Sequence, residues 1–488
     1  MPMHGLAPVL TCALLASGVA PNLELPSIAR EISRSEITRT LAALDYDRTS
    51  GRDGERRGAL ALEERLRAYG IAYTRHDMRA YLSWPVSASL ETLSPHLTGF
   101  SRAITHAFAA RTPLEGVTAE ALFLPRTTED DQTSLPREVA GRIVVAQGLV
   151  SPESAWRAQQ AGALGLVHVN DTDTLHEMIT TTIWGTPTAT SAARIPRIPV
   201  VSIGKADGDR LRAAAAQGPL RLRIKAEVAQ GWATIPLVVA EIKGRSEDFA
   251  LVATHLDAWY AGMTDTAGTV ASILEMARVM QGHARELERG VRFAWWPGHS
   301  FGRYAGSTWF ADRFWSDLDE HCVGYTNLDG SGRRGSQMDR VYAGSWPGIA
   351  EWSREFAKNL TGRDPEGGGQ GTFRPNRDSD SAFQGLGIPE FTIGVPGPPD
   401  GHPDVEPSGL IRYWHTADDT LDKIDGKALE LDTQYRVAQL YDLLTRPSLP
   451  HKIAPIASAY AAALAELSKA AGAAFDLSST QKAAEELL

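Results

Sequence analysis

The chain has 488 residues, of which 43% are hydrophobic and 22% are charged, as in an ordinary globular protein with two or three domains. Its formal net charge of −10 argues against a nucleic acid or an anionic membrane as the main partner. The two cysteines, Cys12 and Cys322, form no Cys-x-x-Cys motif, so any metal site must use histidines and carboxylates.

Residues 1–30 are interpreted as a separate N-terminal segment. Residues 6–20 are apolar and small, like the core of a signal peptide, but no Lys or Arg precedes them and Pro21 follows directly. A signal peptide, an ordinary helix and a disordered start all stay open, and a cytoplasmic location is only slightly favoured over a secreted or periplasmic one. No stretch approaches the ~20 apolar residues of a transmembrane helix, so no membrane partner is expected.

The pattern of predicted helices and strands differs between residues 31–112 and residues 113–229. In the first range, residues 59–71 have apolar side chains at helical spacing and reach a helix-stop signal at Gly70, before an apolar stretch with strand character. In the second range, short strands alternate with helices, which predicts a compact β/α module. The expected strands are 141–148, 166–171 and 195–203, and the expected helices are 155–165 and 206–218.

Residues 230–430 show a second α/β pattern, in which short β-rich runs end in polar residues. Together with residues 31–112, this range predicts a mainly parallel mixed sheet flanked by helices. In such a sheet, ligands bind beyond the carboxyl ends of the strands. Residues 431–488 are expected to be helical. The β-rich runs are 236–244, 249–257, 290–298, 322–329 and 388–395.

The first group of chemically active residues lies in residues 254–268, at the end of one of these runs. A His two residues from an Asp, as in His255 and Asp257, is a usual way to orient an imidazole, because the carboxylate takes one ring N–H while the other nitrogen faces a metal. Asp265 follows in a glycine-containing loop before a long helix, where a carboxylate can bridge two cations. The alternative is a hydrogen-bonded His–Asp pair and a helix N-cap with no metal.

Two further groups follow other strands. Asp329 ends the run 322–329, although an aspartate before glycine is also typical of a turn. His415 precedes a cluster with Asp418 and Asp419, which by itself also suits a surface loop with an N-cap. Taken together, two histidines and two aspartates at separate strand ends of one predicted sheet can hold a divalent cation, zinc first.

Four segments resemble, in order, the metal-site segments of the di-zinc aminopeptidase and glutamate carboxypeptidase family, which includes the transferrin receptor. The resemblance runs from about residue 32 to the end of the chain. It implies a zinc-peptidase-like α/β domain over 31–112 and 230–430, with a protease-associated insert over 113–229 and a truncated dimerisation-type helical segment over 431–488. The four segments are 255–268, 294–310, 325–330 and 413–425.

The resemblance assigns a role to each matching residue. His255, Asp265 and Asp329 match the ligands of one zinc ion, and Asp265 would bridge to a second cation that His415 also binds. Asp257 matches the aspartate that stands behind the first histidine. The implied cofactor is a divalent metal, zinc before others, as one or two ions.

The chain departs from the family in the segment 294–310. Family members carry two consecutive glutamates before the Phe-Gly of this segment, a general base followed by a metal ligand, and here these places hold His299 and Ser300. Ser300 is a neutral hydroxyl and a weak ligand. His299 is a competent general base, so it is interpreted as a base or proton shuttle, as a substitute ligand, or as a remnant without a role.

A few more polar residues are candidates for substrate contacts. Arg374 and Arg377 occupy a region that contacts substrate in the relatives and can pair with a carboxylate, but surface arginines are an equal reading. His402 and Tyr413 are similar cases. Together with Ser300, they complete the candidate site.

These residues predict a metal-dependent hydrolase that acts on an amide or peptide-like bond through metal-activated water, with His299 in place of the usual glutamate. The alternatives are a metal-dependent enzyme with altered chemistry, such as a lyase or a hydrolase of a non-peptide bond, and a non-catalytic partner subunit. A small-molecule or peptide substrate is expected. The helical segment at the C-terminus predicts a homo- or hetero-oligomer, because its apolar faces would need a cover from another chain.

Overall fold

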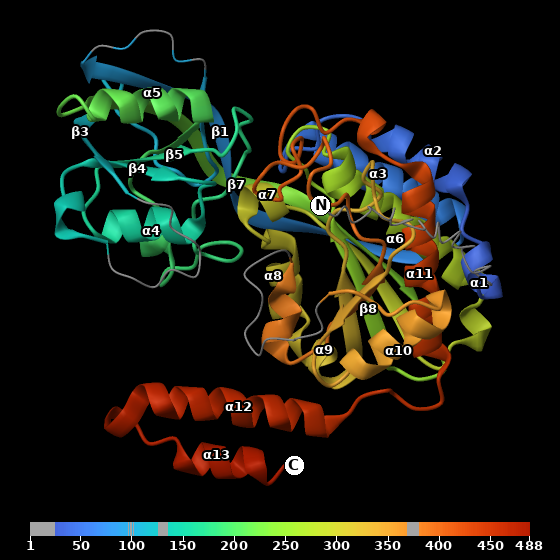
Figure 1. Ribbon diagram of the computed structural model, residues 1–488. Helices are drawn as coiled ribbons and strands as arrows, with labels where there is room; N and C mark the ends of the chain where they lie inside the picture. Colours follow the sequence, from blue (N-terminus) through green and yellow to red (C-terminus); the bar gives the residue numbers. More distant parts are fainter. Residues whose placement is uncertain (1–24, 96, 98–99, 101, 125–134, 368–379) are drawn as a thin grey trace, which may run out of the picture.

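The computed structural model of the protein describes residues 25–95, 97, 100, 102–124, 135–367 and 380–488. Two bodies lie side by side, a larger helix-flanked sheet and a smaller β/α module (Figure 1). Most of the expected segment 1–30 lies outside the described residues. Its described end forms helix α1 (Ser27–Arg30), whose Ile28 and Ala29 are buried in the core of the larger body.

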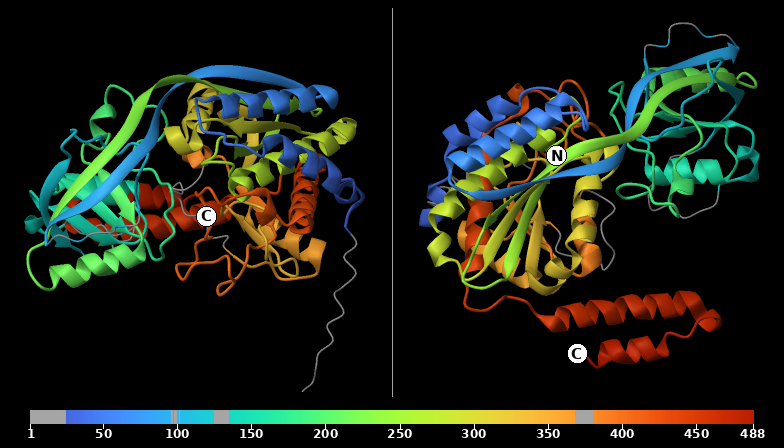
Figure 2. Two further views of the ribbon diagram at one scale, coloured as in Figure 1. Left: turned by 90° about the horizontal axis from the view of Figure 1, so that it is seen from above. Right: turned by 180° about the vertical axis from the view of Figure 1, so that it is seen from behind.

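Two long antiparallel strands, β1 (Ala72–Ser94) and β7 (Arg221–Ile242), run through both bodies (Figure 2). They pair from Ala72 opposite Glu241 to Ser94 opposite Arg221, with register shifts near Pro85 and near the far end. Proline cannot donate to the ladder, so a bulge is a favourable place for it. The expected boundary at residue 229 therefore falls inside a continuous strand.

The sheet of the larger body continues from β7 through β9 (Gly290–Trp296) and β8 (Phe249–His255) to β10 (Cys322–Asn327). Strands β8, β9 and β10 are parallel, whereas β9 is antiparallel to β7. The mainly parallel mixed sheet expected from the sequence is thus confirmed. Because the three parallel strands point the same way, their carboxyl ends meet at one edge.

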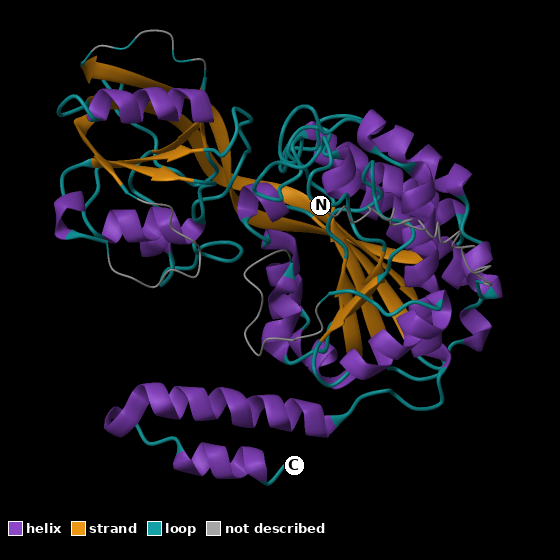
Figure 3. Cartoon of the chain, viewed as in Figure 1, coloured by secondary structure: helices purple, strands orange, loops and turns teal. Residues whose placement is uncertain are grey.

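Helices cover both faces of this sheet (Figure 3). Side chains alternate along each strand, so Val252 packs with the first helical layer and Leu251 with the second. The first layer consists of α2 (Arg34–Leu44), α3 (Asp53–Ala68), α6 (Gly268–Gly282) and α11 (Gly426–Thr445). The second layer contains α8 (Ala305–Arg313) and α9 (Trp315–His321). The separate two-stranded antiparallel sheet of β11 (Tyr342–Ser345) and β12 (Phe391–Gly394) packs with α10 (Ala350–Thr361) beside them.

The smaller body is a mainly parallel β/α module on the far half of β1 and β7. Helix α5 (Lys205–Ala215) packs on one face of its sheet and α4 (Pro152–Gln160) on the other. Strand β2 (Ala103–Thr105) pairs antiparallel with this sheet, so the module includes residues before the expected boundary at 113. Its strands are β2 (Ala103–Thr105), β3 (Val117–Phe123), β4 (Ile143–Gln147), β5 (Gly165–Val169) and β6 (Val200–Ile203).

The C-terminal residues form a hairpin of α12 (Ile453–Ala471) and α13 (Ser478–Glu485), which extends away from the larger body (Figures 1 and 2). Ala457 is the buried residue of α12 and Ala484 that of α13, while Ile453 and Phe475 are 69% and 66% exposed. Within the described residues, no helix combines the length and apolar character needed to cross a bilayer.

Candidate metal centre and active site

The site lies at the edge where β8, β9 and β10 end. His255 is the last residue of β8, helix α7 (His299–Gly302) begins shortly after β9, and Asp329 follows β10. Gly298 makes the turn into α7 with φ of 70°, and a Cβ there would lie 2.9 Å from Ile235 Cδ1. Only glycine fits this left-handed and crowded position, so the local sequence fixes where His299 enters the site.

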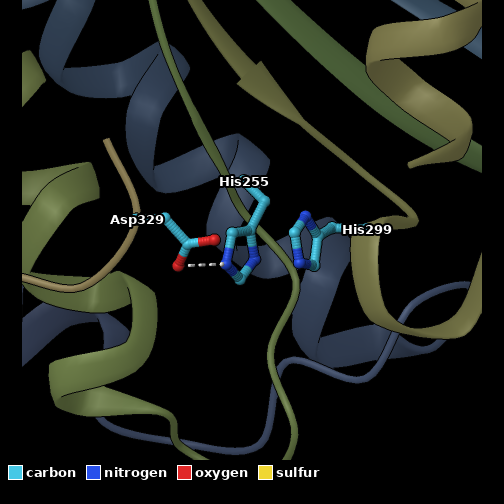
Figure 4. A group of neighbouring side chains, drawn as sticks. All are labelled: His255, His299 and Asp329. Atoms are coloured by element: carbon cyan, nitrogen blue, oxygen red, sulfur yellow. Dashed lines mark ion pairs between the residues drawn. The ribbon is translucent and has the colours of Figure 1, made fainter. Parts of the chain in front are cut away.

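His255, His299 and Asp329 meet at this edge, as Figure 4 shows. One ligand atom from each lies within 4.8 Å of the others, and the imidazole rings of His255 and His299 stack with centroids 3.9 Å apart. His255 Nε2 is 3.5 Å from Asp329 Oδ1. The cluster therefore places two imidazoles and a carboxylate at the distance that a shared cation requires.

The hydrogen bonds of His255 leave one ring nitrogen available. Nδ1 lies 2.7 Å from the main-chain oxygen of Asp257, which can only accept, so Nδ1 carries the proton. Nε2 is buried and has no hydrogen-bond partner among the described residues. Burial lowers the pKa of His255, but Asp329, with Asp265 and Asp257, outweighs it and raises that pKa to about 10. A proton and a cation therefore compete for the same nitrogen.

Asp265 and His415 form the second half of the centre. His415 Nε2 lies 3.7 Å from Asp265 Oδ1, and Asp265 Oδ2 is buried without a hydrogen-bond partner in the described chain. His415 Nδ1 lies 2.7 Å from the main-chain oxygen of Glu177. Nδ1 therefore carries the proton, and the lone pair is on Nε2. Burial lowers the pKa of His415 to about 4, so the ring is neutral near pH 7.

Asp419 supports the short π-helical turn, Met263–Ala267, that carries Asp265. Its carboxylate accepts hydrogen bonds from the main-chain N–H groups of Thr264 and Asp265, at 2.9 and 3.0 Å. Burial, with the charge of Asp265, raises the pKa of Asp419 to about 6. This contact fixes the main chain of the turn with Asp265 against the loop that bears His415.

The carboxylate of Asp257 has a different partner from the one that the His-x-Asp spacing predicted. It accepts the main-chain N–H groups of His299 and Ser300, each at 2.9 Å, and the hydroxyl of Ser50 at 2.6 Å. The imidazole of His255 contacts the carbonyl of Asp257 instead. Because a helix N-terminus favours an anion, Asp257 holds helix α7 in place, and its expected contact with the imidazole is corrected.

His299 has a partner that the sequence did not reveal. Its Nδ1 lies 2.8 Å from Oδ2 of Asp380, which is fully buried and also accepts a hydrogen bond from Ser307. Burial and His255 lower the pKa of His299, but Asp380 and Asp329 outweigh them, so the pKa is raised. The neighbouring Ser300 hydroxyl is buried without a hydrogen-bond partner among the described residues.

The remaining candidates lie elsewhere. His402 Nδ1 accepts the main-chain N–H of Asp404 at 3.1 Å. Tyr413 is 3% exposed and packs with two apolar residues of the same loop, Val405 and Ile411. Both belong to the loop that leads to His415. Arg374 and Arg377 lie outside the described residues.

The donor set fits a divalent cation. His255 Nε2 faces Asp329 Oδ1, and His415 Nε2 faces Asp265 Oδ1. Imidazole with carboxylate is a ligand combination typical of zinc. Nε2 of His255 and Oδ2 of Asp265 are buried without hydrogen-bond partners in the described residues, as expected of atoms that bind a cation.

Comparisons with known proteins agree with this geometry. The family model described as Peptidase family M28 matches residues 238–437, and that of the PA domain matches residues 111–211. A probable glutamate carboxypeptidase VP8 from Zea mays is 25% identical over 62% of this chain and 50% of its own length. Aminopeptidase YwaD from Bacillus subtilis (strain 168) is 24% identical over 71% of each chain. The chain thus spans about half the length of the maize relative.

Solved structures share the fold. An aminopeptidase from Aneurinibacillus sp. strain AM-1 superimposes with a TM-score of 0.63 at 22% identity, over 86% of this chain and 96% of that one. BSAP, a zinc aminopeptidase from Bacillus subtilis, gives a TM-score of 0.57 at 21% identity, over 88% and 98%. The resemblance predicted from the sequence is confirmed: residues 238–437 match peptidase family M28, residues 111–211 match the PA domain, and strands β1 and β7 join the two regions.

Proposed function

We propose that the protein is a metal-dependent hydrolase of an amide or peptide-like bond, in which His299 is the proton-transfer group. The observation that carries this proposal is the buried contact between His299 Nδ1 and Asp380 Oδ2, directly beside His255 and Asp329. When bound there, a divalent cation supplies Lewis acidity, which polarises a carbonyl group and makes water more acidic.

The contacts of His299 suit a base. Asp380 accepts the Nδ1 hydrogen, so the tautomer is fixed and Nε2 keeps the lone pair that accepts a proton. A carboxylate behind an imidazole also stabilises the imidazolium that forms when the proton arrives. The hydrogen bond from Ser307 and the buried surroundings fix the orientation of the Asp380 carboxylate. His299 and Asp380 thus together take the proton-transfer role that a single glutamate has in the family.

A role of His299 as a metal ligand also has support. One nitrogen of its ring lies within 4.8 Å of the ligand atoms of His255 and Asp329, which is also the arrangement of a third ligand. In that case a carboxylate or water would have to serve as base. The neutral Ser300 at the place of the usual second glutamate removes one negative charge from the site, which favours one tightly held cation over two.

Two other functions are compatible with these residues. A single cation with His299 nearby also suits cleavage or elimination on a small, non-peptide substrate, because neither reaction needs the second glutamate. A non-catalytic partner subunit would have no need for the buried, unpartnered Nε2 of His255 and Oδ2 of Asp265.

One experiment separates the three. The purified protein is analysed for metal content and then incubated with peptides, amino-acid amides and esters in ¹⁸O-labelled water. The proposal predicts at least one cation per chain and one ¹⁸O atom in the acid product. Bound cation with unlabelled product would favour a lyase, and a chain that binds no cation would favour the non-catalytic function.

A further inference from the structure

The PA domain reaches into the metal centre of the peptidase domain. Its residues His176 and Glu177 lie against Trp414 and His415 and exchange main-chain contacts with them. The N–H of Glu177 donates to the carbonyl of His415 at 3.1 Å, and the carbonyl of Glu177 accepts His415 Nδ1 at 2.7 Å. The tautomer of His415 is therefore set by a main-chain atom of the other domain.

His415 needs such support because its backbone is strained. It has φ of 55°, in the left-handed region that residues with a Cβ seldom adopt. A strained backbone of this kind persists only when surrounding contacts determine it. The contacts with Glu177 lie at this residue itself.

The side chain of His176 stabilises this contact between the two domains. It is buried, and its Nδ1 donates to the carbonyl of Trp414 at 2.5 Å. On its other side, Nε2 lies 3.6 Å from Glu406 Oε1, an atom that also accepts the hydroxyl of Thr172 at 2.6 Å. Glu406 belongs to the peptidase domain and Thr172 to the PA domain, so this group bridges the two domains next to His415.

We infer that the PA domain is a positioning element of the metal centre, and that His176 is the residue through which it holds His415 toward Asp265. The inference rests on the proposed metal function and adds to it. It makes domain docking and cation binding reciprocal, because two events that favour the same arrangement must favour each other equally.

The test measures cation affinity, by competition with a chromophoric chelator for zinc, on full-length variants. His176→Ala removes the donor to Trp414 and is expected to weaken zinc binding about 10- to 100-fold, as is typical for a residue that orients a ligand. His176→Asn keeps a nitrogen donor near the position of Nδ1 and is expected to restore most of the affinity.

The matched control is His168→Ala. His168 is also a buried histidine of the PA domain, and its Nδ1 also lies 3.0 Å from a main-chain carbonyl, that of Gly148, but this contact stays inside the domain. It is expected to reduce stability without reducing zinc affinity more than about threefold. In a His415→Ala background, His176→Ala should have no further effect, because coupled residues are not additive.

A measurement on the unaltered protein keeps the inference testable if His176→Ala fails to fold. Zinc should slow amide hydrogen exchange in peptides that contain Glu177, whose N–H donates to His415, and leave peptides from helix α5 unchanged. Equal zinc affinity in His176→Ala and the unaltered protein, equal losses in His176→Ala and His168→Ala, or no protection at Glu177 would each overturn the inference. Failure of the unaltered protein to bind zinc would instead refute the proposed function.

Discussion

Replacing Asp380 by Asn tests the proposed partner of His299 with little change in shape. Asp380 is fully buried and accepts hydrogen bonds from His299 and Ser307. A hydrogen bond to a charged group contributes about 1.5–3 kcal/mol, against about 0.5–1.5 kcal/mol for a neutral one. The lost charge alone therefore costs about 1–1.5 kcal/mol, or roughly 5- to 13-fold in rate.

A second effect adds to this loss. The amide of Asn can present its NH₂ group to His299, which would move the imidazole proton to Nε2 and remove the base. Loss of a general base costs about 10²–10⁴-fold. Turnover should therefore fall by at least the roughly 5-fold of the lost charge and by at most about 10⁴-fold. Because Asp380 is not expected to ligate the cation, zinc affinity should change less than about threefold, as a chelator competition would measure.

Ser307→Ala is the matched control for Asp380→Asn. It removes the other hydrogen bond to Asp380 but leaves the negative charge and the contact with His299. Its turnover should fall less than about tenfold, in line with the loss of one hydrogen bond. If folded Asp380→Asn kept turnover within about twofold of the unaltered protein, Asp380 would not orient the proton-transfer group and the reasoning would fail.

Three further predictions concern the cation, the assembly and the surface. Asp265→Ala should abolish binding of at least one cation, as elemental analysis would show, and an unchanged metal stoichiometry would contradict the ligand assignment. The chain should be oligomeric at micromolar concentration and monomeric without residues 447–488; sedimentation of the full chain as a monomer would refute this. Burial lowers the pKa of His283, but hydrogen bonds with Glu31 and Glu286 raise it overall. The raised pKa stabilises the fold at low pH and less as pH rises through it, so His283→Gln should lower the urea midpoint at about pH 6. The same change should have little effect at about pH 9, and an equal loss at both would exclude this linkage.

The fold was predictable because its pattern is local. Apolar runs ending in polar residues indicated β8, β9 and β10, and parallel strands bring such ends to one edge. The candidate ligands could be read from the same ends. The domain boundary at 229 could not, since β7 continues through it and no break in hydrophobic pattern marks where a strand passes between bodies.

The partners of the candidate ligands depend on tertiary contacts that leave little signal. Asp380 lies 81 positions from His299 and belongs to a polar stretch that looks like a surface loop. The carbonyl of Glu177 could be supplied by any residue type, so its contact with His415 has no sequence signature. Asp257 shows a third limit of prediction from sequence. The His-x-Asp spacing does not decide whether the imidazole of His255 contacts the carboxylate or the main-chain carbonyl of Asp257.

His299→Gln, assayed for turnover and bound metal on the same preparation, tests the central claim most directly. His299 as the proton-transfer group predicts turnover at least about 10²-fold lower with full metal content, because Gln is neutral, of similar length and unable to accept the proton. A large loss of metal would instead identify His299 as a ligand. Full turnover together with full metal would contradict both roles and require another base.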